Sequence, residues 1–413
     1  MADLRITNVR PWGGEPADLV VTDGVLTDVA PRVPAGTGSP AEAAEPGSSA
    51  VLDGGGLLAL PGFVNAHAHV DKSWWGAPWV SWGGEATTQG RIAHERAERD
   101  ALGIPGHDST VAVLRELLRH GTTAVRTHVD VDLGVGLRGI ETVRAAAAEL
   151  DGALALELVA FPQDGVLRRP GVLDLLRAAA RAGVDHVGGI DPASIDRDPV
   201  AQVEALVDLA ATEGVGIDLH LHDPGELGAF QCELLADRVR RAGLGGRVTV
   251  SHGFALGDVG PLGPGSVGAA RQEALLDDLA AAGIAWTTVA PVRTVPLPWR
   301  QMVERGIALG LGTDGIRDLW SPYGDGDLLR VALGFARLHG LRTDDDLVAA
   351  VRLATSGGAA FVGRPQHDLV VGAPGDVVLL DAENVADALV RAPVRRHVVA
   401  RGRVVVRDGE PTV

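Results

Sequence analysis

Short apolar segments alternate with amphipathic segments through the middle of the chain, and this alternation constrains the fold more than any other feature. It predicts strands at 58–69, 122–129, 154–161, 186–190, 216–222, 247–252, 284–289 and 307–313. It predicts helices between them at 110–120, 172–182, 200–212, 230–242 and 272–282. Strands that are apolar on both faces and separated by helices indicate a parallel sheet. Eight such units predict an α/β fold of the TIM-type (β/α)8 barrel class. An open doubly wound sheet is the alternative, but no GxGxxG motif follows a strand.

The two ends of the chain have a different pattern, with short strand-like segments separated by turns rich in Gly, Pro and Asp. Such segments lie at 4–9, 19–21, 376–380, 397–400 and 403–406. The segment 35–49 is rich in Gly, Ser, Pro and Ala and is expected to be an exposed loop. We expect residues 1–60 and 366–413 to form one small β-sandwich domain, with the barrel at 61–365.

Composition limits the partners of the chain. The 413 residues carry a formal charge of -17, which argues against nucleic acids and anionic membranes and favours a small neutral or cationic ligand. The single Cys232 excludes an internal disulfide and fits a reducing cytoplasm. No segment approaches the roughly 18 apolar residues of a membrane span, and the amino terminus lacks the pattern of a signal peptide.

Residues that bind metals end four of the predicted strands. His67 and His69 end the first strand, and side chains two apart on a strand point to the same face. His220 ends the fifth strand, His252 the sixth, and Asp314 follows the eighth. Because the carboxyl ends of barrel strands form the active-site face, these side chains are expected to converge on one mouth. Neutral imidazoles with one carboxylate suit a divalent ion such as Zn or Fe.

The same segments resemble the amidohydrolase superfamily and, within it, the cytosine deaminase-like branch. The matching motifs are 61–71 (PGFVNAHAHVD), 125–130 (VRTHVD), 159–165 (VAFPQDG), 217–220 (IDLH), 248–252 (VTVSH) and 314–324 (DGIRDLWSPYG). The second and third motifs are diagnostic of the branch, whereas HxH belongs to the whole superfamily. The resemblance extends from Pro61 to about Gly363, with the flanking β-domain also as expected.

The resemblance implies a role for each matching position. His67, His69, His220 and Asp314 would hold one divalent metal, Zn or Fe, because strand 186–190 lacks the lysine that bridges two metals in other members. His252 would orient the water that the metal activates, and Asp314 would accept its proton. Gln163 and Trp320 would line the substrate pocket. The implied reaction is hydrolytic deamination, which releases ammonia from an amino-substituted nitrogen heterocycle such as cytosine or a related cyclic amidine.

Two positions depart from the cytosine deaminase pattern. A glutamate that shuttles protons lies three residues after the ligand histidine in those enzymes, and Asp223 occupies that position here, with Glu226 as the alternative. An acidic residue follows the ligand aspartate in those enzymes, whereas Gly315 follows it here, which puts cytosine itself in doubt.

Other polar residues near the motifs are candidates for contacts with the substrate. His128 and Lys72 are expected to face the mouth, His128 in contact with the substrate or with a metal ligand. His222 shares a strand face with His220 and either points into the pocket or forms a hydrogen bond with Asp223 or Asp314. A cluster of loop tryptophans would stack on a flat ring or, alternatively, pack within the loop or against another subunit: Trp74, Trp75, Trp79 and Trp82.

Two other functions compete with deamination. A ring-opening amidohydrolase would keep the metal but cleave the C–N bond of a cyclic amide, and would not release ammonia. A binding protein on a barrel scaffold would lack catalysis, but the complete set of ligands argues against it. The sequence leaves open whether copies of the chain associate into a homo-oligomer.

Overall fold

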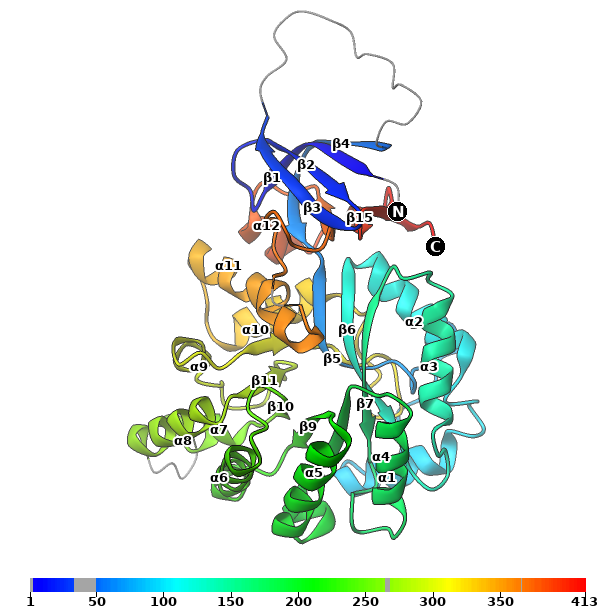
Figure 1. Ribbon diagram of the computed structural model, residues 1–413, viewed down its shortest axis with the longest axis vertical. Coiled ribbons are helices and arrows are strands. Elements are labelled where there is room, and N and C mark those ends of the chain that lie inside the picture. The colour runs from blue at the N-terminus through cyan, green and yellow to red at the C-terminus, as the bar shows by residue number, and fades with distance from the viewer. Residues whose placement is uncertain (1–2, 33–49, 264–267, 365) are drawn as a thin grey trace, which may run out of the picture.

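Two β-sheets carry the fold, one from the middle of the chain and one from its two ends (Figure 1). The computed structural model describes residues 3–32, 50–263, 268–364 and 366–413. In the first sheet all neighbouring strands are parallel, in the order β12-β11-β10-β9-β8-β7-β6-β5-β13. Its strands are β5 (Phe63–His69), β6 (Thr122–Asp130), β7 (Ala155–Phe161), β8 (His186–Ile190), β9 (Gly216–Leu221), β10 (Val248–His252), β11 (Ile284–Thr288), β12 (Leu309–Leu311) and β13 (Asp314–Gly315).

The eighth strand is divided into two short pieces, and these close the sheet into a barrel because each piece pairs with a different edge of the sheet. β12 pairs with β11, and β13, which begins three residues after β12 ends, pairs with β5 through Asp314 and Ala68. The two edges of the sheet therefore meet at one segment of the chain. The predicted (β/α)8 barrel is confirmed, and the open sheet is not observed among the described residues.

Helices surround the barrel on its outer side, except for the last one, α12, which lies beside the sheet that the chain ends form (Figure 1). They are α1 (Thr88–Glu98), α2 (His107–Arg119), α3 (Arg138–Ala148), α4 (Val172–Arg181), α5 (Pro199–Glu213), α6 (Gly225–Ala242), α7 (Ala255–Asp258), α8 (Ala269–Ala281), α9 (Trp299–Glu304), α10 (Leu328–Leu338), α11 (Asp344–Leu353) and α12 (Val385–Arg391). Most of them bury an apolar face, and α2 for example packs Leu114 and Leu117 into the same core as Phe63 of β5. The exception is α1, which buries the charged side chains of Arg91 and Glu95. The helices α5 and α6 end at Gly214 and Gly243, which adopt the left-handed conformation that glycine allows.

The chain ends form the second sheet, in the order β17-β16-β15-β14-β4-β1-β2-β3. Its strands are β1 (Leu4–Pro11), β2 (Ala17–Thr22), β3 (Val25–Pro31), β4 (Ala50–Pro61), β14 (Val377–Leu380), β15 (Arg395–Ala400), β16 (Arg403–Arg407) and β17 (Glu410–Pro411). The predicted unit from both termini is therefore confirmed. The segment 33–49, which contains the predicted exposed loop, lies outside the described residues.

The predicted strand 58–69 belongs to both sheets. Leu58 to Pro61 pair with β14 of the terminal sheet, and the barrel strand begins at Phe63. The division falls at Gly62, where a Cβ atom would lie 2.1 Å from the hydroxyl oxygen of Thr123. The sequence did not predict this break, because both sheets bury their part of the segment and the segment therefore reads as one continuous apolar run. None of the helices in the described ranges is long and apolar enough to cross a membrane.

Closure of the barrel requires glycine at position 312. A Cβ atom there would lie 2.5 Å from the carbonyl oxygen and 2.5 Å from the Cβ atom of His67. Because these atoms belong to the backbone and the Cβ position of a strand residue and cannot rotate away, Gly312→Ala is expected to lower the free energy of unfolding by about 1–3 kcal/mol in urea titrations. Gly334→Ala is the control, since nothing lies within 4 Å of a Cβ on this residue of α10. Equal unfolding midpoints for Gly312→Ala and the wild type would contradict this account.

Candidate metal centre and substrate cavity

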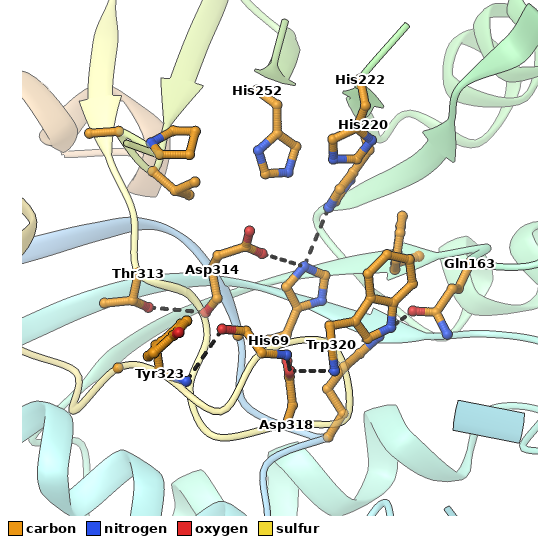
Figure 2. Close-up of a pocket in the computed structure, with 18 of the residues that line it drawn as sticks. His69, Gln163, His220, His222, His252, Thr313, Asp314, Asp318, Trp320 and Tyr323 are labelled. Carbon is orange, nitrogen blue, oxygen red and sulfur yellow. Dashed lines mark hydrogen bonds and ion pairs between the residues drawn. The ribbon is translucent and has the colours of Figure 1, made fainter. Parts of the chain in front are cut away.

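The side chains at the carboxyl ends of the barrel strands converge as predicted (Figure 2). Two overlapping groups have ligand atoms within 4.8 Å of one another: His67, His69, His128 and His220 in one, and His67, His252 and Asp314 in the other. The Nε2 atoms of His220 and His69 are 3.3 Å apart. All four predicted ligands therefore lie together, and each comes from β5, β9 or β13.

Asp314 completes the set from the closing strand. One of its carboxylate oxygens lies 3.5 Å from Nε2 of His67 and 3.4 Å from Nε2 of His69. Burial opposes ionisation, but its contacts with His67 and His69 hold the pKa of Asp314 well below its usual range. The backbone of Asp314 has a φ of 61°, and His252 has a φ of 70°. Left-handed backbone at such residues costs about 1–3 kcal/mol each and is typical of functional sites.

The donor set fits a divalent cation. Burial lowers the pKa of His69, His220 and His252 well below the usual value, so these imidazoles are neutral at pH 7 and offer lone pairs. Nε2 of His67 is buried and has no hydrogen-bond partner among the described residues. Three imidazoles and a carboxylate around one point are the ligands that Zn and Fe accept.

A hydrogen-bonded chain below the centre orients His67. The Ser251 hydroxyl donates to a carboxylate oxygen of Asp218 over 2.5 Å, and the hydroxyl oxygen lies 2.9 Å from Nδ1 of His67. Ser251 therefore accepts from Nδ1–H, which leaves the Nε2 lone pair free to bind a metal. Although burial opposes it, the charges of His128 and Arg126 hold the pKa of Asp218 well below its usual range. Sequence reasoning assigned no role to Ser251 and Asp218, although Asp218 precedes His220 by two positions on the same strand face.

His128 lies beneath the centre rather than at its mouth. It is fully buried, its ring centroid is 4.2 Å from that of His67, and its Nε2 lies 3.3 Å from a carboxylate oxygen of Asp218. Burial and the neighbouring His67 lower the pKa of His128 to about 4. It is not among the residues that line the cavity, so the geometry places it with the metal ligands; its contact with the substrate stays a prediction.

A cavity of about 390 Å³ opens above the centre. The predicted substrate residues Lys72, Gln163 and Trp320 line it together with His69, His220, His252 and Asp314. Other residues that line it are Phe161, Ile190, His222, Val289, Ala290, Pro291, Val292, Thr313, Gly315, Asp318, Ser321, Tyr323 and Gly324. The ring of Phe161 stacks on that of His220 with centroids 4.1 Å apart.

Lys72 joins the predicted substrate residues through a buried charged network. Its Nζ atom donates to Oε1 of Gln163 over 2.7 Å and lies 2.8 Å from Asp130 and 3.5 Å from Glu95. Trp320 donates from Nε1 to Glu95 over 2.6 Å. Burial opposes the charge, but Asp130 and Glu95 raise the pKa of Lys72 above its usual value. Sequence reasoning missed Glu95, which lies on α1 in no recognisable motif, and Asp130, which follows His128 by two positions on β6.

The fifth strand places three polar side chains differently. His222 lines the cavity, its Nδ1 lies 3.0 Å from Asp191, and its ring stacks on His252 with centroids 4.4 Å apart. Asp223 is 5% exposed, accepts a hydrogen bond from Gln231 over 2.9 Å and is not among the residues that line the cavity. Glu226 lies 3.3 Å from Arg271 with a side chain that is 55% exposed. His222 therefore faces the cavity, as one of the two interpretations predicted. It also contacts a carboxylate, but this carboxylate is Asp191 and not the predicted Asp223 or Asp314.

The loop tryptophans lie outside this cavity. None of the four residues lines it, and the rings of Trp74 and Trp79 pack edge to face with centroids 5.3 Å apart. Trp82 stacks on the guanidinium of Arg91 at 4.2 Å. The structure therefore favours packing within the loop over stacking on a substrate.

Removal of the Ser251 hydroxyl is expected to weaken metal binding. Ser251→Ala leaves Nδ1 of His67 without its acceptor, so the ring loses its fixed orientation and tautomer. The affinity for Zn should fall by about 10- to 100-fold in competition with a chelator. Ser109→Ala is the matched control, because that hydroxyl lies on α2 and bonds the carbonyl of Gly106. An unchanged Zn affinity in Ser251→Ala would mean that this hydroxyl does not orient the ligand.

Comparisons with known proteins agree with the fold and identify the family. A model of the amidohydrolase family matches residues 107–413. The N-isopropylammelide isopropyl amidohydrolase of Pseudomonas sp. (strain ADP) is 31% identical over 371 residues, which cover 86% of this chain and 88% of that protein. The structure of N-isopropylammelide isopropylaminohydrolase from Burkholderia multivorans ATCC 17616 is 38% identical, has a TM-score of 0.90 and covers 100% of both chains.

A second solved structure supports the predicted branch. The 5-methylcytosine deaminase from Klebsiella pneumoniae, with 5-fluorocytosine bound, is 25% identical, has a TM-score of 0.81 and covers 98% of this chain and 97% of that chain. The resemblance predicted from the motifs is confirmed by these matches. The chain therefore belongs to the amidohydrolase family and is a hydrolase that acts on C–N bonds other than peptide bonds.

Proposed function

We propose that this enzyme is a metal-dependent hydrolytic deaminase that releases ammonia or a small amine from an amino-substituted nitrogen heterocycle. The observation that carries the proposal is the meeting of three imidazoles and one carboxylate at the base of a 390 Å³ cavity whose wall holds Gln163, Lys72 and Trp320. The relatives above are named for N-isopropylammelide and 5-methylcytosine, and these names support a heterocyclic substrate.

One divalent ion, Zn or Fe, would be held by His67, His69, His220 and Asp314. When bound, such an ion lowers the pKa of water toward about 7 and so supplies a nucleophile at neutral pH. A second ion is not proposed, since β8 (HVGGI) offers no lysine to bridge two metals. His128 and His252 complete the surrounding imidazoles.

The residues of the chain then position the ring and move protons. Oε1 of Gln163 accepts from Lys72, so its Nε2 group is left to donate to a ring oxygen or nitrogen. Trp320 offers an indole face whose Nε1 is fixed by Glu95. Asp314 accepts a proton from the attacking water. His252 orients that water, since its ring nitrogen lies within 4.8 Å of the Asp314 carboxylate.

Protonation of the leaving amine needs a donor that reaches the cavity. Asp223 is the donor that the motif predicts, with Glu226 as its alternative, and both stay predictions. His222 is a third candidate because it lines the cavity beside His252. Burial opposes the protonated form, but the hydrogen bond and charge of Asp191 raise the pKa of His222 above its usual value. His222 is therefore the best placed of the three.

The ring-opening amidohydrolase remains the alternative function. The same centre would hydrolyse a cyclic amide, and the cavity does not separate the two reactions. The cytoplasmic location, the homo-oligomer and the exact domain boundaries also stay predictions.

A screen of heterocycles tests the function. Enzyme loaded in turn with Zn and Fe is offered N-isopropylammelide, pterin, 5-methylcytosine, cytosine and cyclic amides, and released ammonia or amine is measured. Deamination yields one equivalent per turnover, whereas ring opening yields none. Asp314→Asn and His220→Ala should bind less metal, measured by atomic emission, and lose at least about 100-fold in kcat, while the exposed-site control His107→Ala keeps both. Full metal content and activity in Asp314→Asn would refute the assignment of the centre.

The pH profile identifies the proton donor. If His222 donates, activity holds while it is protonated and falls as pH rises through its raised pKa. His222→Asn should lower kcat by about 10²- to 10⁴-fold and remove this fall. Asp191→Asn removes the attraction that raises the pKa, so the fall should move to lower pH. If Asp223→Asn loses activity while His222→Asn keeps the wild-type profile, the donor is Asp223.

A further inference from the structure

Gly315 leaves room for a carboxylate that arrives from elsewhere in the chain. It follows the ligand Asp314 on β13, at the position where the cytosine deaminase pattern has an acidic residue. A Cβ atom on Gly315 would lie 1.7 Å from Oδ2 and 2.6 Å from Cγ of Asp318. The Asp318 carboxylate therefore occupies the space in which a side chain at position 315 would begin.

Asp318 is held rigidly in that place. Its Oδ1 accepts hydrogen bonds from the backbone N–H groups of Trp320 and Ser321, each over 2.8 Å, and its own N–H donates to the Ser321 carbonyl over 3.0 Å (Figure 2). The residue is 4% exposed and lines the substrate cavity. The orientation of the carboxylate is thus fixed by backbone groups before any substrate arrives.

The second oxygen of this carboxylate has no partner in the described part of the chain, since no hydrogen bond or ion pair reaches Oδ2 there. When a ligand fills the cavity, this oxygen loses its hydrogen bonds to water, which costs free energy. A ligand that donates an N–H group to the oxygen offsets this desolvation penalty. Burial, with the nearby charge of Asp314, raises the pKa of Asp318 to about 6 although Lys72 lowers it. The carboxylate is therefore largely ionised above pH 7.

We propose that Asp318 is a specificity-determining residue whose free oxygen accepts a hydrogen bond from a ring N–H of the heterocycle. This inference rests on the proposed function and narrows it. Substrates would carry an unsubstituted ring N–H on the edge that faces Asp318, and rings alkylated at that nitrogen would be rejected. Carbonyl groups on that edge would meet a negative charge and would be disfavoured as well.

The test pairs a variant with a ligand that lacks the donor. Asp318→Asn keeps an oxygen for the two backbone N–H groups but replaces Oδ2 with an NH₂ group, so an acceptor becomes a donor. N-isopropylammelide and its analogue methylated at the ring nitrogens are compared on Zn-loaded enzyme, with kcat and KM measured separately. If the screen identifies another ring as the substrate, that ring and its N-methyl analogue are the pair.

A charge-assisted hydrogen bond predicts a coupled loss. KM of the wild type should rise roughly 10- to 100-fold on methylation, and KM of Asp318→Asn should rise by a similar factor with the parent compound. Methylation of the ligand should then raise the KM of Asp318→Asn little further, because the variant already lacks the same contact. Most of the change should fall on KM rather than kcat.

The outcomes that overturn the inference are specific. A wild-type KM in Asp318→Asn excludes the contact. So does an Asp318→Asn variant whose KM rises on methylation by the same factor as that of the wild type. The wild-type comparison of the two ligands needs no variant, so it holds even if Asp318→Asn folds poorly. Asp325→Asn makes the same chemical change on the same loop, outside the cavity, and should leave KM within about twofold. A wild type that turns over no ring counts against the proposed function instead.

Discussion

The pairing of β13 with β5 is the contact on which the rest of this site depends. It closes the barrel and brings Asp314 beside the two histidines of the opposite edge. Because β13 is two residues long, side chains reinforce it: Asn65 accepts from the N–H of Thr313 over 3.1 Å and donates to its hydroxyl over 2.8 Å. The left-handed backbone of Asp314 is tolerated there because these contacts fix the segment on both sides. Without this closure the three imidazoles would face no carboxylate.

The interior of the barrel is arranged in layers along a single strand. Asp218, His220 and His222 alternate on β9 and just beyond its end, so they share one face at increasing height. Asp218 lies beneath the centre, where it anchors Ser251; His220 lies at the level of the ligands; and His222 reaches the cavity beside Asp191. The lowest layer therefore orients His67, the middle layer holds the predicted metal ligand His220, and the upper layer places His222 at the cavity.

The part of the cavity wall that contains Lys72 is held by charge rather than by apolar packing. Lys72 lies among Asp130, Glu95 and Gln163, and Glu95 fixes the indole of Trp320. A lysine that is 3% exposed is tolerated because these carboxylates compensate the loss of hydration. The network ties α1, which is inserted after β5, to the loop that follows β13. A substrate in the cavity is thus bordered by neutral imidazoles on one side and by a fixed polar network on the other.

The alternating apolar pattern of the sequence was sufficient to predict the barrel and the meeting of four metal-binding side chains, because the apolar period sets a parallel sheet and a parallel barrel gathers the ends of its strands. The meeting of His67, His69, His220 and Asp314 followed from their positions at the ends of strands, whereas their role as metal ligands was implied by the family resemblance. The motifs also predicted Gln163 and Trp320 as pocket residues, and the position of Lys72 after the metal motif predicted a third; all three line the cavity. These are consequences of strand order, which local pattern encodes.

Tertiary structure decided what depends on distance between segments that have no fixed spacing. The contact of Glu95 with Lys72 and Trp320, and the position of Asp223 against Gln231 instead of the cavity, follow from how loops pack. The same holds for the Asp318 carboxylate, which lies where a side chain on Gly315 would begin. Only the fold of the loop after β13 brings this carboxylate to that position. The direction of a side chain in a loop is set by many weak contacts with residues that are distant in the sequence, and the local sequence does not encode these contacts.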